Sequence, residues 1–336
     1  MDYSLFFLLD HYPASSQSID DVYQNVITQS KQAEKLGYYG IYVAEHHVEN
    51  YGVLPNPALL LAWVGQQTQS LKLGTAITIL PLHSPLRVAE EYALLDLLSN
   101  GRVELGVGSG FLANEFTCFG QDIENKRQLF DETLLAIEAL LANETVSFNN
   151  AHLHAGQNAK LNIHTFKHRP LPIYVAAVNP HSAYYIGQQQ RHMMAVPFNG
   201  YQADVNAPQA FIKNYQHGWQ TQNHSTPHGK IIMNFFCHVA ESDQQARKNI
   251  AKAFGQYVLT RTSSDFSTQN PEAIYDAWLA KDLLLCGSVN TVVNKLRQLK
   301  KIGLQHIMTF QNFGAAEPEV IQQSMQLFAK EVITQL

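Results

Sequence analysis

The chain has 336 residues, of which 46% are hydrophobic and 15% are charged, and its formal net charge is -5. This composition is typical of a compact globular protein with a large core and excludes an intrinsically disordered chain. The small negative charge gives no electrostatic reason to expect nucleic acid or an anionic membrane as partner, so a small-molecule ligand is expected.

The first apolar residues, 3–9, indicate a strand rather than a secretion signal, because the run is short and no basic residue precedes it. The longest other apolar run, 58–64, falls well below the roughly 18 residues that a membrane span needs. The three cysteines form no CxxC pair and are odd in number, which favours a reducing cytoplasm over a disulfide framework: Cys118, Cys237 and Cys286.

Strands and helices alternate along the chain. After the strand at 3–9, apolar residues recur at helical spacing over 19–36, with Ser18 as a cap and Gly37 as a stop signal. The same cycle then repeats. The later pairs of strand and helix are predicted at 40–44 and 56–68, 71–79 and 85–98, 102–107 and 125–141, 171–177 and from 180, 193–196 and 207–220, 230–240 and 242–258, and 305–309 and 318–332.

Eight strands that alternate with helices, without a break in composition, predict a (β/α)8 TIM barrel rather than an open doubly wound sheet. Residues 1–336 are therefore expected to form a single barrel domain. Residues 259–287 interrupt the cycle and are too long for a connector. This insertion near the C-terminal part is predicted to pass over one mouth of the barrel, where such segments often act as lids.

Polar side chains directly follow the first two predicted strands. Glu45, His46 and His47 come after the second strand, and Asp10 and His11 hold the equivalent position after the first. The carboxyl ends of barrel strands meet at one mouth, where active sites are built. A catalytic site, a metal site and a solvated loop are all open interpretations at this point.

A metal site is the least favoured of these. Zinc ligands usually come at spacings such as HExxH, and the adjacent His46 and His47 cannot easily direct both rings at one ion. We therefore predict no metal ligands. Four histidines of a polar connector could form a surface metal cluster, although a solvated loop explains them more simply: His152, His154, His164 and His168.

A glycine-rich segment follows the fourth predicted strand, with glycines at 106, 108 and 110. A dinucleotide-binding GxGxxG motif would need its third glycine at position 111, where this chain has Phe111. The glycines could leave room beside a flat ligand or could simply form a tight turn.

An anion could bind at the start of a later helix. Asn179 precedes Pro180 there, so free N–H groups and the helix dipole would favour a phosphate, and Arg127 could add charged hydrogen bonds. An ordinary helix cap and a surface arginine explain the same residues.

Seven motifs follow one another along the chain: AEHH (44–47), LPNP (54–57), LKLGTAITILPLHSPLRVAEEYALLDLLSNGRVELGVGSG (71–110), EFTCFG (115–120), NKR (125–127), PIYVAA (172–177) and LCGS (285–288). In this order they resemble the bacterial luciferase-like flavin-dependent monooxygenases. The resemblance spans nearly the whole chain and is densest from 38 to 127.

The resemblance implies that reduced flavin mononucleotide (FMN), supplied by a separate flavin reductase, binds at the C-terminal mouth. The reduced FMN would react with O₂ to a C4a-hydroperoxide that oxygenates a small organic substrate such as an aldehyde or ketone. A dry, apolar mouth and one well-placed proton donor or acceptor suit this chemistry, and histidine exchanges protons readily near neutral pH. A cytoplasmic homodimer is expected.

The resemblance also implies roles for single residues. His46 matches the family's catalytic histidine, and a non-proline cis peptide is expected between Ala76 and Ile77. The remaining flavin contacts are expected from Thr75, Ala76, Ile77, Gly108, Ser109 and Ala177 at the ring and from Arg127, Asn179 and Ser182 at the phosphate.

The chain departs from the light-emitting subunit of the family at two places. Gly108 and Ser109 stand where that subunit has a reactive cysteine and an arginine, and Val178 and Asn179 replace a glutamate–serine pair. Light emission is therefore not expected. Gly108 is predicted to leave more room beside the flavin, for a substrate other than a slim fatty aldehyde. Residues 259–271 match a segment that is mobile in that subunit.

Two alternatives remain from the sequence. An oxidoreductase that uses the deazaflavin coenzyme F420 would share the barrel, but its long anionic tail needs more basic residues at the mouth than the chain offers. A non-catalytic flavin-binding subunit is the other alternative, and the retained Glu45, His46 and His47 argue against it.

Overall fold

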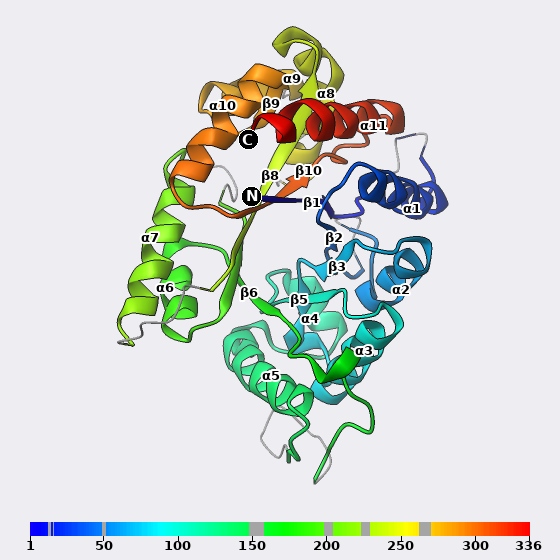
Figure 1. Cartoon of the computed structure of the whole chain (residues 1–336), viewed down its shortest axis with the longest axis vertical. Helices are drawn as coiled ribbons and strands as arrows, with labels where there is room; N and C mark the ends of the chain where they lie inside the picture. Colours follow the sequence, from blue (N-terminus) through cyan, green and yellow to red (C-terminus); the bar gives the residue numbers. More distant parts are fainter. Residues whose placement is uncertain are drawn as a thin grey trace.

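The computed structural model describes residues 1–12, 15, 17–48, 52–147, 158–197, 204–222, 229–261 and 270–336. In these residues eight parallel strands close into a barrel, because β10 (His306–Phe310) pairs with both β1 (Asp2–Phe7) and β8 (Ile231–Ala240). The predicted TIM barrel is confirmed. The other strands follow in chain order (Figure 1): β2 (Gly40–Val43), β3 (Lys72–Thr75) with β4 (Thr78–Ile79), β5 (Val103–Gly108), β6 (Ile173–Ala177) and β7 (His192–Ala195).

Helices connect the strands and surround the barrel (Figure 1). Their starts follow local signals, such as the capping box of Ser18 with Asp21 and the cap of Asn56 before Pro57. The helices are α1 (Ile19–Lys35), α2 (Pro57–Gln67), α3 (Pro85–Leu98), α4 (Ala113–Cys118), α5 (Lys126–Leu141), α6 (Pro180–Gln188), α7 (Ala207–Gln220), α8 (Asp243–Leu259), α9 (Pro271–Ala280), α10 (Val289–Lys301) and α11 (Pro318–Leu327).

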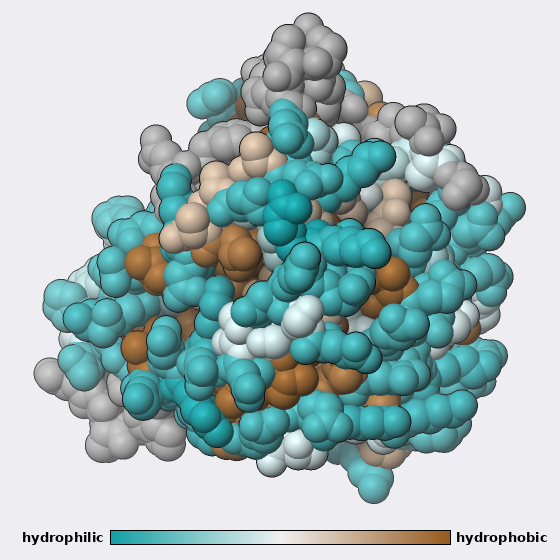
Figure 2. Space-filling view, turned by 90° about the horizontal axis from the view of Figure 1, so that it is seen from above, coloured by the Kyte–Doolittle hydropathy of each residue, from teal (hydrophilic) through white to brown (hydrophobic). Residues whose placement is uncertain are grey.

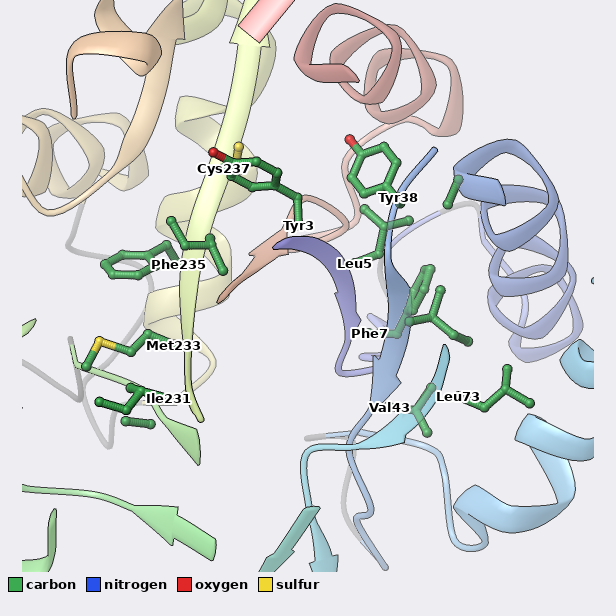
Figure 3. Packing of buried hydrophobic residues seen from close by; sticks show 14 of the residues in the cluster. Tyr3, Leu5, Phe7, Tyr38, Val43, Leu73, Ile231, Met233, Phe235 and Cys237 are labelled. Carbon is green, nitrogen blue, oxygen red and sulfur yellow. The ribbon is translucent and has the colours of Figure 1, made fainter. Parts of the chain in front are cut away.

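Side chains alternate between two apolar layers along each strand. On β1, Tyr3, Leu5 and Phe7 belong to the large cluster between barrel and helices (Figure 3). Phe6 and Leu8 belong to a second cluster, which gathers residues of β2, β6, β7, β8 and β10 inside the barrel. Each large side chain buried in this way stabilises the fold by about 1.5–3 kcal/mol. The two layers therefore fix which residues face the interior.

The N-terminal end of the barrel has a polar interior. Tyr39 and Tyr42 donate hydrogen bonds to the two carboxylate oxygens of Glu104. The ring of His306 lies edge-on to both tyrosine rings, and its Nε2 is 2.8 Å from Oγ of Ser4. Burial lowers the pKa of His306 to about 3, so this imidazole is neutral at pH 7. This layer lies at the end of the barrel that serves stability.

The predicted insertion contains more regular structure than expected. α9 packs against α8, and β9 (Leu285–Ser288) pairs with Cys237–Ala240 of β8, beyond the residues that pair with β10. The strand β9 was not predicted within 259–287, because the short apolar run before Gly287 has no alternation that reveals a strand. Residues 262–269, which include much of the predicted lid, lie outside the described residues.

None of the described helices combines the length and the apolar character that crossing a bilayer requires. On the face seen in Figure 2, apolar side chains lie in separate groups between hydrophilic ones. Scattered apolar groups of this kind are normal on a protein surface.

Candidate functional site

The residues that follow β2 are buried at the C-terminal mouth of the barrel. Glu45, His46 and His47 are only 1%, 6% and 7% exposed. The Glu45 N–H donates to the carbonyl of Ile77 at 3.2 Å, and the His46 N–H donates to the carbonyl of Leu54 at 3.1 Å. A solvated loop is therefore excluded, and the segment has a fixed backbone. Buried polar groups in such a place need partners.

The partner of His46 is Glu115 on α4, a residue without an individual role in the sequence-based prediction. Nδ1 of His46 lies 3.0 Å from Oε1 of Glu115, and the main-chain N–H of His47 donates to the same oxygen at 2.9 Å. A carboxylate accepts hydrogen bonds, so the chemistry of the pair assigns the donor role to Nδ1–H of His46. Oε2 of Glu115 is buried and has no hydrogen-bond partner among the described residues.

Glu45 joins a different group of side chains. Its Oε1 lies 2.7 Å from Nε2 of His47 and 2.6 Å from Nε2 of His83, and its Oε2 accepts the N–H of Ile79 at 3.1 Å. Burial acts to raise the pKa of Glu45, but the hydrogen bonds and charge of the two histidines outweigh it and lower the pKa. Burial acts to lower the pKa of His83, and Glu45 reverses this, so the pKa is raised.

The end of the third barrel strand contains the expected cis bond. The peptide between Ala76 and Ile77 is cis, as predicted. Thr75 is fully buried and donates from Oγ1 to the carbonyl of Gly106 at 2.7 Å, while Ala76 and Ile77 are partly exposed. These two residues therefore offer surface at the mouth, and Thr75 holds the strand beneath them.

The space beside Gly108 is filled, contrary to the prediction of extra room. A Cβ at Gly108 would lie 3.0 Å from Cγ1 and Cδ1 of Ile77 and 3.4 Å from Cβ of Ala176. Ile77 thus takes the room that the glycine leaves. Ser109 is partly buried next to it. Ala177 packs in the outer cluster, so Ala176 is the alanine of β6 whose side chain lies near Gly108.

Apolar side chains are exposed around the same mouth. Each stands just after the C-terminal end of a strand, namely β2, β5, β6 and β7. We call them the apolar rim, and they are 61%, 56%, 61% and 43% exposed in this order: Val48, Phe111, Val178 and Val196. The Phe111 ring is also edge-on to His46, with 6.0 Å between ring centroids. Their position at the carboxyl ends of barrel strands, where active sites are built, makes them candidates for lining a ligand site.

The residues predicted to bind phosphate are engaged in local contacts. The Arg127 side chain is 52% exposed, and its Nε lies 3.4 Å from Oδ2 of Asp131. Oδ1 of Asn179 accepts the N–H of Ser182 at 2.8 Å, and Oγ of Ser182 donates to the Asn179 carbonyl at 2.7 Å. An anion at this helix start would have to compete with a complete capping box.

Other predicted polar groups take part in structure. Asp10 accepts hydrogen bonds from Arg261 at 2.6 Å and from the hydroxyl of Tyr12 at 2.9 Å. The rings of His164 and His168 stack with 3.9 Å between centroids. The other two histidines of the proposed surface cluster, His152 and His154, lie outside the described residues.

Comparison with known proteins gives the family. The family model of luciferase-like monooxygenases matches residues 1–306 of the chain. The chain belongs to the luciferase-like monooxygenase family. Limonene 1,2-monooxygenase of Rhodococcus erythropolis is 25% identical to the chain over 304 residues, covering 88% of this chain and 76% of that enzyme. The oxygenase component of the flavin-dependent trigonelline monooxygenase of Acinetobacter baylyi is 25% identical, covering 76% and 71%.

A relative of higher identity covers less of the sequence. An uncharacterized protein of Sinorhizobium fredii is 32% identical over 173 residues, which are 52% of this luciferase-like chain and 49% of that protein. A second protein of the same organism is likewise matched over 52% of its length. The chain thus spans about half the length of these two relatives.

Solved structures share the luciferase-like fold over the whole chain. The monooxygenase RslO1 of Streptomyces bottropensis is 25% identical, with a TM-score of 0.86 and coverage of 100% and 99%. The oxygenating constituent of 3,6-diketocamphane monooxygenase of Pseudomonas putida, solved with FMN, is 20% identical, with a TM-score of 0.84 and the same coverage. The F420-dependent tetrahydromethanopterin reductase of Methanopyrus kandleri is 16% identical, with a TM-score of 0.75 and 99% coverage of both chains. The last two comparisons concern the fold alone.

Proposed function

We propose that the protein is a flavin-dependent monooxygenase that uses reduced FMN and O₂ to oxygenate a small organic substrate of the aldehyde or ketone class. The observation that carries the proposal is the buried His46–Glu115 pair, which lies at the same mouth as the apolar rim. Membership in a family of monooxygenases and the named activities of its relatives support the reaction class.

The mouth suits a flat, apolar ring system. Phe111 and Val178 expose apolar surface there, and Ala76 and Ile77 are accessible beside the backbone of Gly108. Apolar walls with a few convergent polar groups are the usual lining of a cofactor site. When bound, reduced FMN supplies two electrons to O₂, so that one oxygen atom enters the substrate and the other leaves as water.

His46 is the residue that we propose to move a proton. Glu115 accepts a hydrogen bond from Nδ1–H of His46, so Nε2 is the ring nitrogen that we propose to take up a proton and return it. The buried carboxylate also stabilises the ring when it becomes positively charged. Phe111, edge-on to the imidazole, limits the access of water on its side. Glu115 thus acts as a positioning residue for His46.

The flavin phosphate is proposed to bind between Arg127 and the start of α6. Because the side chains of Arg127 and its ion-pair partner Asp131 are 52% and 41% exposed, Arg127 can turn to an anion at little cost. Ser182 can reorient its hydroxyl, but Asn179 must then give up part of the capping box. The ring contacts are proposed from Thr75, Ala76, Ile77, Gly108, Ser109 and Ala177, the last through its backbone.

Two features support the expected partners and compartment. The relative from Acinetobacter baylyi is named an oxygenase component, which supports a separate reductase as the source of reduced FMN. Cys118, Cys237 and Cys286 are all free thiols, which supports a reducing cytoplasm. The two alternatives are less well supported. The F420-dependent oxidoreductase needs more basic residues at the mouth than the chain offers, and the pairing of His46 with a carboxylate argues against a non-catalytic flavin-binding subunit.

A homodimer is proposed through α2 and α3. Leu59 and Trp63 are four residues apart on α2, and Leu94 and Leu98 are four residues apart on α3. All four are exposed, by 71%, 39%, 48% and 55%, and the two helices pack on each other. Apolar side chains at this spacing form one face on each helix, which a second copy of the chain can cover.

Single-turnover oxidation of reduced FMN tests the function. The purified chain is mixed with anaerobically reduced FMN, then with O₂ and a panel of aldehydes and ketones, and the oxygenated product is identified by mass spectrometry. We expect product with the wild type and a loss of about 100-fold or more in His46→Ala. Oxygenation at an unchanged rate in His46→Ala would refute the role of His46. Hydride transfer from reduced F420, without oxygenation, would favour the alternative cofactor.

A further inference from the structure

Three possible metal ligands converge beside the His46–Glu115 pair. The ligand atoms of Glu45, His47 and His83 all lie within 4.8 Å of one another. The sequence argued against a metal because His46 and His47 are adjacent, yet the structure brings His83, not His46, to the other two. We propose that Glu45, His47 and His83 form a binding site for a divalent transition metal of the zinc class.

The chemistry of the three side chains suits such an ion. Two imidazole nitrogens and one carboxylate oxygen are the ligand set of several zinc enzymes and of iron sites with open positions. Ligand atoms about 2.1 Å from a tetrahedral ion lie roughly 3.4 Å apart. The present separations are 2.7 Å and 2.6 Å from Glu45 Oε1 to the two histidines, and at most 4.8 Å for any pair. Small side-chain rotations therefore suffice to admit an ion.

The surroundings hold the ligands as a metal site requires. Oε2 of Glu45 accepts the N–H of Ile79 at 3.1 Å, which orients the carboxylate, and the side chains of Glu45 and His47 are 0% and 7% exposed. Such outer contacts strengthen metal sites considerably. The His83 side chain is 26% exposed, so an ion can arrive from solvent and keep a water ligand. This burial distinguishes the group from adventitious histidines on the surface.

The site is physically connected to His46. The main-chain N–H of His47 donates to Oε1 of Glu115, the oxygen that also contacts Nδ1 of His46. Glu115 therefore contacts both His46 and His47. An ion bound to the His47 ring would restrain His47 and, through Glu115, the His46 ring. Occupancy of the metal site is thereby linked to the orientation of the His46 imidazole.

Titration of Zn²⁺ into the full chain, freed of metal with EDTA, tests the site by isothermal titration calorimetry. We expect one Zn²⁺ per chain that is lost in His83→Gln, with affinity at least about 100-fold lower, because even outer-shell losses cost 10- to 100-fold. Co²⁺ should give visible absorption bands of four- or five-coordinate geometry in the wild type but not in His83→Gln. His217→Gln, which removes an exposed histidine of α7, should bind like the wild type.

Two results would overturn the proposal. One is a wild-type chain without saturable Zn²⁺ binding. The other is binding of equal affinity and stoichiometry in the wild type, His83→Gln and a second ligand variant, His47→Gln, which would assign the ion to other groups. Circular dichroism of each variant establishes that it is folded, and the second variant serves if the first does not fold.

Discussion

Glu115 Oε1 lies 3.0 Å from Nδ1 of His46, although 69 residues separate the two in the sequence. The barrel makes this contact possible, because β2 and β5 both end at the same mouth and α4 follows β5. Both side chains are buried, so the pair exists at a place where its electrostatic effect on a bound ligand is large. The relationship fixes the orientation of the His46 ring.

Replacing Glu115 with glutamine should slow the reaction without abolishing flavin binding. The amide is nearly isosteric but has no negative charge to orient and stabilise the protonated His46 ring. We expect kcat to fall about 10- to 100-fold, with a changed pH profile and a similar Kd for FMN. Stopped-flow kinetics and fluorescence titration with FMN measure the two quantities.

A double variant separates positioning from mere structural damage. If Glu115 acts through His46, then Glu115→Gln should add little to the loss already caused by His46→Ala, because the two residues act as one unit. Fully multiplicative losses in the double variant would speak for independent roles and against the pair.

The buried His306 should make the fold sensitive to mild acid. Burial lowers the pKa of His306 from 6.5 to about 3 in the folded protein. Between these pH values the unfolded chain takes up a proton that the folded chain does not, so the free energy of unfolding falls as the pH falls. The stability that the neutral, buried His306 contributes is fully present above pH 6.5. Below pH 6.5 the free energy of unfolding falls by about 1.4 kcal/mol per pH unit.

Urea unfolding at pH 7, 6 and 5 measures this slope. The glutamine in His306→Gln can still hydrogen-bond to Ser4 but binds no proton in the unfolded chain. The free energy of unfolding of this variant should therefore fall less steeply with falling pH than that of the wild type. His217→Gln removes an exposed histidine and serves as the control, with the slope of the wild type. A slope in His306→Gln identical to that of the wild type would contradict the assignment.

Adding a methyl group at Gly108 should crowd Ile77. The new Cβ would lie 3.0 Å from two atoms of the Ile77 side chain. We expect Gly108→Ala to lower the free energy of unfolding by about 1–3 kcal/mol, as overpacked sites do. Removing Cγ1 and Cδ1 with Ile77→Ala should relieve the clash, so the double variant should be more stable than the sum of the two single effects predicts. Additive thermal shifts would mean that Ile77 does not fill this space.

The barrel and the cis bond could be predicted from the sequence, and the reasons differ. The alternation of strand and helix patterns is local and repeats eight times, so single errors such as the missed β9 do not change the fold. The cis bond at Ala76–Ile77 came from the family resemblance alone. Neither kind of reasoning tells which way a side chain points, so the sequence did not reveal that Ala176, and not Ala177, turns its side chain to Gly108.

The partners of the site histidines could not be predicted. Glu115 on α4 and His83 before α3 are far from His46 and Glu45 in the sequence, and only the closed barrel brings them together. Glu115 lay within a recognised motif, EFTCFG, but nothing in its spacing marks it as a histidine partner. The filled space at Gly108 was missed for a related reason, since a glycine in the sequence does not reveal which neighbour occupies its place.

The exposed face of α2 and α3 should carry the dimer. Leu59→Glu on α2 and Leu98→Glu on α3 each put a charge into an interface that is otherwise apolar. Both substitutions should therefore turn dimers into monomers in sedimentation velocity experiments. Leu135→Glu on α5 is the matched control, because Leu135 is 60% exposed and lies on another helix. Dissociation by the control as well, or a wild type that is monomeric at every concentration, would contradict this interface.

Dissociation should leave the site intact. The residues that we assign to the mouth, from His46 and Glu115 to the apolar rim, follow the C-terminal ends of barrel strands and do not belong to α2 or α3. The Leu59→Glu monomer should therefore bind FMN with a Kd within about twofold of the wild type, provided that it remains folded. A large loss of FMN binding in a folded monomer would mean that the partner subunit contributes to the site, because the four residues of the α2–α3 face belong to helices rather than to the mouth.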